Sequence, residues 1–170
     1  MRPVVLLIVS TIVVLPGRVA AQSHEAHRHS GAHEDSAFRA MQSRGQDVMG
    51  VDQYTSIHHF VALSDGGRIE LQRDRDDSAG TAAIRVHLRT IAKAFSDGDF
   101  LAPFAVHQDS VPGVPAMRER RSAIGYAVTD LPRGAELRIR TADPVALEAI
   151  HRFLAYQRRE HRTDEPLHAH

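Results

Sequence analysis

Two stretches of the chain share one pattern, and this repetition limits the fold more than any other feature. In each stretch, a run of alternating apolar and polar residues is followed by a turn signal, a second alternating run and an amphipathic helix. The alternating runs cover residues 57–63, 69–72, 124–128 and 137–139. The turns are expected at Asp65-Gly66-Gly67 and at Pro132-Arg133-Gly134.

Each hairpin is followed by a helix signal. The first helix is expected over residues 81–95, with an apolar stripe of Ile84, Leu88, Ile91 and Phe95. The second is expected from Pro144, behind Asp143 as N-cap, to about His161. A short helix is also expected over 36–49, whereas the prolines of 97–117 predict irregular chain. The fold class is therefore α+β: a four-stranded antiparallel sheet with two helices on one face, in ββα-ββα order.

The alternation also predicts which side chains face the core. Ile57, His59 and Val61 are expected inside, while Glu70 and Arg138 belong to an outer, solvated sheet face. The two halves align locally, so they are either an internal duplication or two unrelated units with the same common pattern.

The N-terminus has the features of a secretory signal peptide over residues 1–21. Arg2 is followed by an apolar run from Val4 to Leu15, and Val19 and Ala21 provide the small residues of a cleavage site. The alternative is an uncleaved membrane anchor, for which the run is short. We expect a periplasmic or secreted protein with no membrane contact after cleavage. The other expected parts are a disordered tail over 22–35, a single domain over 36–162 and a flexible tail over 163–170.

Composition excludes several functions. The chain has no Cys, which rules out disulfides, thiolate catalysis and cysteine-based metal or haem attachment. Its 21 Lys and Arg balance 21 Asp and Glu, which argues against a nucleic-acid partner. The sequence identifies no protein partner.

Histidine is the residue type that points to chemistry, with 12 copies in the chain. Neutral imidazole is a common ligand of copper, nickel and zinc. Four histidines, His24, His27, His29 and His33, lie in the tail. Cleavage after Ala21 would give a terminal amine, two amides and the His24 imidazole, a four-nitrogen set suited to Cu(II) or Ni(II). The alternative is a solubilising tail.

A second group of histidines is expected inside the fold. His59 on its strand and His87 on its helix could meet between sheet and helix, with His107 as a third ligand and His58 as an alternative. His151 occupies the position equivalent to His87. The alternative is that all are ordinary core residues with hydrogen-bond partners. The remaining histidines are His161, His168 and His170. His168 and His170 in the C-terminal tail could assist a surface site, but we expect this group to be solvated.

The sequence contains no signature of an enzyme: no nucleophile elbow, P-loop, dinucleotide-binding glycine pattern or HExxH motif occurs, and no catalytic residue is assigned. A general base at His59 or His87 is the only enzymatic alternative. The segment MQSRGQDVMGVDQYTSIHHF (41–60) resembles a stretch of small secreted bacterial proteins without assigned function. That resemblance implies export and no mechanism. We therefore interpret the chain as an exported metal-binding protein for copper, nickel or zinc, with an envelope interaction module as the alternative.

Overall fold

The computed structural model describes residues 22–50 and 55–163, and for residues 22–34 and Met49 it describes the backbone alone. The expected signal peptide over residues 1–21, His168 and His170 lie outside these ranges. The chain divides into two units, Met1–Asp35 and Ser36–His170. The elements are α1 (Gln22–Met49), β1 (Ser56–Leu63), β2 (Gly66–Arg73), α2 (Ser78–Ser96), α3 (Leu101–His107), α4 (Val114–Glu119), a 3₁₀ turn (Arg121–Ala123), β3 (Ile124–Leu131), β4 (Gly134–Thr141) and α5 (Pro144–Glu160).

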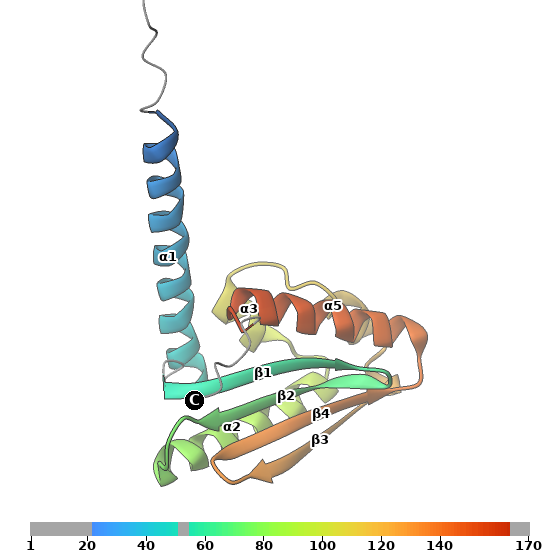
Figure 1. Ribbon diagram of the computed structural model, residues 1–170. Helices are drawn as coiled ribbons and strands as arrows, with labels where there is room; N and C mark the ends of the chain where they lie inside the picture. The colour runs from blue at the N-terminus through green and yellow to red at the C-terminus, as the bar shows by residue number, and fades with distance from the viewer. Residues whose placement is uncertain (1–21, 51–54, 164–170) are drawn as a thin grey trace, which may run out of the picture. The chain divides into compact units, whose positions relative to one another are not determined.

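The second unit is the expected α+β fold. Its four strands form one antiparallel sheet in the order β1-β2-β4-β3, so the two hairpins meet through β2 and β4, and β1 and β3 are the edges. Figure 1 shows the hairpins lying side by side, with α5 alongside β1. The helix α2 packs mainly on β4 and β3, and α5 mainly on β1 and β2. Their apolar stripes join the inner sheet residues in one core.

The apolar stripes predicted for the two long helices are confirmed. In α2, Ile84, Leu88, Ile91 and Phe95 are all buried. The helix α5 begins where the Asp143 carboxylate accepts hydrogen bonds from the backbone N–H groups of Val145 and Ala146. Of the described helices, none is long and apolar enough to cross a bilayer.

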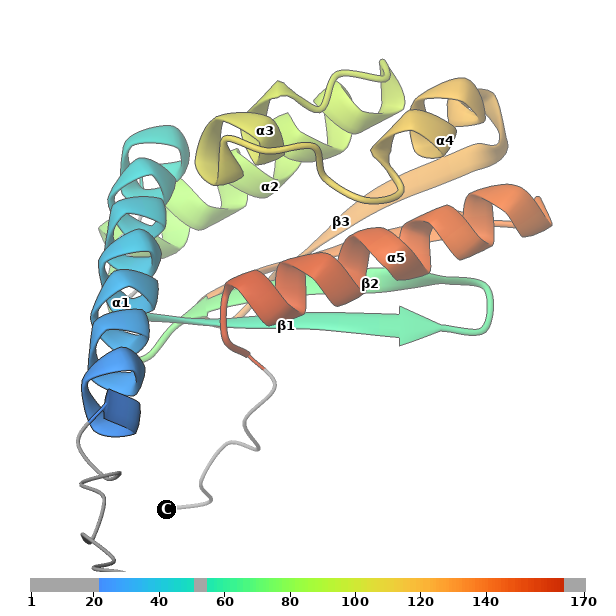
Figure 2. The same cartoon turned by 90° about the horizontal axis from the view of Figure 1, so that it is seen from above.

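Two expectations about other parts of the chain are wrong. Residues 22–35, expected to be disordered, form the first part of α1; this stretch has no proline and a single glycine, Gly31. Residues 97–117 contain α3 and the start of α4 instead of irregular chain. Pro103 and Pro115 lie in the first turns of these helices, where a missing N–H costs no helical hydrogen bond. Figure 2 shows α3 and α4 on the same side of α5, and α4 packs against α5.

The first hairpin turn is shorter than expected, and this changes which side chains of β1 face inward. The turn is Ser64-Asp65, and Gly66 already belongs to β2, with a φ of 140° that favours glycine. A three-residue turn at 65–67 would place Val61 opposite Leu71. The observed register places His58 opposite Leu71 instead, so the inner face of β1 carries His58 and Phe60. The expectation that His59 faces the core is wrong for this reason.

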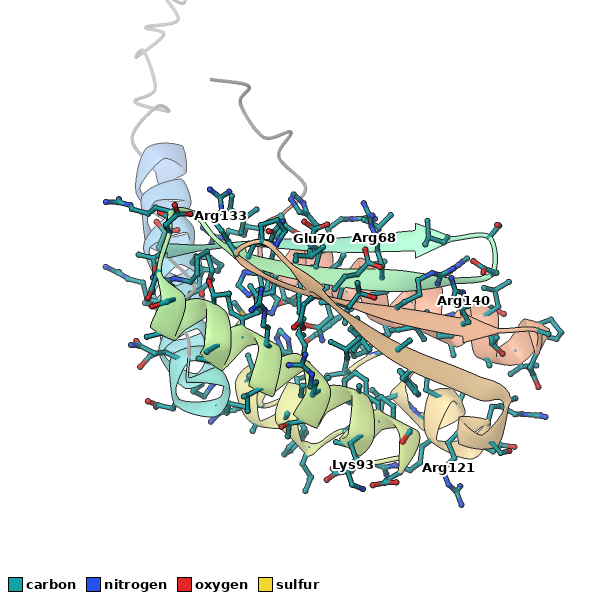
Figure 3. The ribbon with its side chains drawn as sticks, turned by 90° about the horizontal axis from the view of Figure 1, so that it is seen from below. Arg68, Glu70, Lys93, Arg121, Arg133 and Arg140 are labelled. Carbon is teal, nitrogen blue, oxygen red and sulfur yellow. The ribbon has the colours of Figure 1, made fainter. Side chains whose placement is uncertain are left out.

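The outer face of the sheet is charged, as the alternation predicts. Figure 3 shows Arg68 and Glu70 of β2 and Arg140 of β4 on this face. Arg68 pairs with Glu136 at 3.5 Å, and Arg138 with Asp65. Positively and negatively charged side chains alternate and form ion pairs on this face, which makes it suited to contact with solvent.

One inward side chain of the second hairpin leaves a polar atom without a partner. The hydroxyl of Tyr126 is buried next to the Phe95 ring and has no hydrogen-bond partner among the described residues, and burial raises the pKa of this phenol. An unsatisfied buried hydroxyl costs free energy in the folded state. We therefore expect Tyr126→Phe to raise the free energy of unfolding by about 1 kcal/mol, measured by urea titration. A loss of stability would contradict the unpaired state of this hydroxyl.

Candidate functional site

Four histidines from four different elements line one pocket on the helical side of the sheet. They are His58 of β1, His87 of α2, His107 at the end of α3 and His161, the C-cap of α5. The cavity has a volume of about 80 Å³, more than a single water needs.

The rest of the wall is mainly apolar. Gln157 is the fifth polar lining residue, and the others are Val48, Phe60, Ile69, Leu71, Leu88, Ile91, Phe95, Ala102, Pro103, Val106 and Phe153. No Asp, Glu, Lys or Arg occurs among the described lining residues. The polar side chains of the described wall are therefore the four imidazoles and one amide.

His161 lies at the centre of the histidine cluster. Its ring centroid is 5.6 Å from that of His58 and 5.4 Å from that of His107. The apolar stripe of α5 explains this position, because residues 150, 153, 154 and 157 are buried and residue 161 continues the same helical spacing. The expectation that His161 is solvated is wrong. The helical spacing itself was the signal that could have found it.

His107 is held by two neighbours. Its Nε2 is 3.0 Å from Oε1 of Gln157, and its ring lies edge-on to Tyr156. With the amide oxygen accepting the Nε2–H bond, Nδ1 keeps a free lone pair. The end of α3 is tied to α1 by Arg44, whose Nε donates to the carbonyl oxygen of Val106 at 2.8 Å.

His58 and Gln157 each bring a buried polar atom without a hydrogen-bond partner to the described pocket wall. The Nε2 of His58 is buried and has no hydrogen-bond partner in the described structure. A buried nitrogen without a partner costs free energy, as the hydroxyl of Tyr126 does. A ligand in the pocket that donates a hydrogen bond or accepts the lone pair would remove this cost.

The imidazoles of the pocket are neutral at neutral pH. Burial lowers the pKa of His58 and of His87 to about 4, and for His58 the neighbouring His87 and His59 add to the effect. Burial, with His58 and His107 nearby, lowers the pKa of His161 to about 3. Burial also lowers the pKa of His107, while the Gln157 hydrogen bond and Glu160 oppose the shift. Neutral imidazole is the form that binds metals.

The structure brings together only part of the predicted site. Of the expected inner set, His87 and His107 line the pocket, His59 lies on the opposite face of β1, and the alternative His58 takes the inner position. His151 lies elsewhere, with Nε2 at 2.9 Å from the carbonyl oxygen of Leu63 and 3.1 Å from that of Gly66. The side chains of His24, His27, His29 and His33 lie outside the described part, so metal binding by them stays a prediction.

The described residues of the pocket do not form a complete coordination sphere. Within residues 22–50 and 55–163, as far as their side chains are described, no group of three or more His, Asp or Glu residues is arranged to hold a metal ion. His58 and His107 each form a close pair with His161 instead. Comparison of the chain with known protein families, curated proteins and solved structures found no match.

Proposed function

We propose that this is an exported protein that binds a transition-metal ion, copper, nickel or zinc, in the pocket lined by His58, His87, His107 and His161. The observation that carries the proposal is the unpaired, buried Nε2 of His58 inside a cluster of neutral imidazoles. A metal ion is a partner that can accept lone pairs from several imidazoles at once.

The surroundings of the cluster also support metal binding. Two imidazoles on one ion, each with a metal–nitrogen bond of about 2 Å, have ring centroids roughly 5–6 Å apart. The His58–His161 and His107–His161 centroid distances of 5.6 and 5.4 Å lie in this range. The Gln157 amide next to His107 is the type of outer partner that orients a histidine ligand.

His107 and His161 lie at helix ends, where a ring can turn towards an ion with little disturbance of the core. In this proposal the tail histidines His24, His27, His29 and His33 capture ions and the pocket holds one. The envelope interaction module remains the alternative, and no contact in the described residues favours it.

The test is metal titration of a chain in which the four tail histidines are replaced by alanine, so that the pocket alone is measured. We expect this chain to bind about one equivalent of metal. Elemental analysis after desalting measures the amount bound. His58→Ala and His161→Ala are each expected to weaken binding at least tenfold, because each removes one nitrogen ligand.

The matched control is His59→Ala, the neighbouring histidine on the other face of β1. It is expected to leave metal binding unchanged. Circular dichroism of each variant confirms that it is folded. Uptake of no transition metal by this chain at neutral pH would contradict the proposal, and so would equal losses in His58→Ala and His59→Ala.

A further inference from the structure

The composition of the pocket wall favours some ionic charges over others. Eleven of the sixteen described lining residues are apolar, and the remaining five, four histidines and Gln157, include no carboxylate that could offset the charge of an ion. The acidic groups that act on the cluster from outside the wall are Asp109 and Glu160, both through His107. An ion in this pocket would therefore keep nearly its whole charge in an apolar environment.

Charge in an apolar environment is costly, and the cost rises with the square of the charge. The desolvation penalty is therefore about four times larger for a divalent than for a monovalent ion of equal size. Divalent zinc in proteins is compensated by thiolates or carboxylates, or by a water in an open fourth position. The described wall offers no thiolate or carboxylate.

The number of available ligands also favours a monovalent ion. No three or more ligand residues of the described part are arranged around a common point, but two close histidine pairs share His161. Zinc and nickel require four or more ligands in most protein sites. Copper(I) has a filled d shell and is stable with two or three neutral nitrogen ligands.

From these observations we propose that the pocket selects monovalent copper, Cu(I), held by His161 together with His58 or His107. This rests on the proposed function, since it names the ion of the same site. His87, which lies close enough to His58 to influence it electrostatically, is a candidate third ligand. The apolar wall would also keep water, and with it a fourth ligand, away from the ion.

The experiment uses the same chain with alanine at the four tail histidines, under anaerobic conditions with ascorbate as reductant. Cu(I) is offered as its bathocuproine disulfonate complex, and loss of the complex colour reports transfer to the protein. Zn(II) and Ni(II) are titrated separately against chromophoric chelators. We expect Cu(I) to bind at least about 100-fold more tightly than Zn(II).

X-ray absorption at the copper edge then reports the ligands. Two or three nitrogen neighbours with no sulfur is the expected result. His161→Ala is expected to abolish transfer of copper from the chelator, and His107→Ala to weaken it. His59→Ala is the control, expected to behave like the parent chain.

The outcomes separate the two proposals. If Zn(II) or Ni(II) binds the pocket as tightly as Cu(I) and His161→Ala removes that binding, selectivity for Cu(I) is overturned and the metal-binding function stands. If no ion binds, both proposals are overturned. If Cu(I) binds equally well to His161→Ala and to the parent chain, the assignment of the ion to this pocket is overturned.

Discussion

Replacing Gly134 by alanine is expected to lower the free energy of unfolding by about 3 kcal/mol or more. Gly134 opens β4 opposite Gln72 of β2, at the junction between the two hairpins. A Cβ atom at this position would lie 1.9 Å from the carbonyl oxygen of Leu71 and 2.9 Å from Cα of Gln72. Both are backbone atoms of a central strand, so relief requires β2 and β4 to separate. The total stability of a domain of this size is typically only 5–15 kcal/mol.

The matched control for this substitution is Gly125→Ala on the edge strand β3. The nearest atom to a Cβ there is the carbonyl oxygen of Arg140 at 3.9 Å, an ordinary contact. We expect its stability to be unchanged or raised by up to about 1 kcal/mol, because alanine loses less backbone entropy than glycine. Urea titration followed by circular dichroism measures both variants. Equal stability of Gly134→Ala and the parent protein would contradict the close approach of the two hairpins.

The second large effect is a loss of stability in mild acid, measured on metal-free protein in the presence of a chelator. His58 and His87 have a folded-state pKa of about 4, against 6.5 for the free side chain. The unfolded chain therefore binds more protons between pH 6.5 and 4. Stability rises with pH over this window, is complete above about 6.5, and is lost as the pH falls.

The size of the acid effect follows from the same shifts. One pKa unit corresponds to 1.36 kcal/mol, so each of His58 and His87 contributes a loss on the order of 3 kcal/mol at pH 4. Two such losses match the whole stability of many domains, and we expect the fold to be lost between about pH 4 and 6.

Urea titrations at several pH values between 7 and 4 measure this dependence. His58→Phe, which keeps an aromatic ring without a titrating group, is expected to reduce the slope of stability against pH. Stability independent of pH between 6.5 and 4.5 would show that the imidazoles are not buried as described.

The secondary structure could be predicted where the hydrophobic period was strong. The stripe of Ile84, Leu88, Ile91 and Phe95 and the cap at Asp143 specified α2 and α5 from local sequence. The helices α3 and α4 were missed because Pro103 and Pro115 were interpreted as breakers, although proline is tolerated in a first turn.

The positions of the pocket histidines could be predicted only in part. The alternation of β1 is ambiguous, because Ile57, Val61 and Leu63 on one side outnumber Phe60 and Ala62 on the other. The choice between them is made by the register with β2, which a turn of two residues sets. His107 and His161 come together because α3 packs against α5. Such tertiary packing cannot be predicted from a local sequence pattern.

The four pocket histidines are spread over more than 100 residues and come from both hairpin–helix units and from α3. Neither half of the chain contains all four histidines. Binding of an ion by all of them would therefore require the whole domain to be folded. By mass action, an ion at 100 times its dissociation constant would add about 2.7 kcal/mol to global stability. If the chain is exported and binds a metal ion as proposed, such linkage would make the loaded form more resistant to proteolysis, so that metal supply would set how much protein persists.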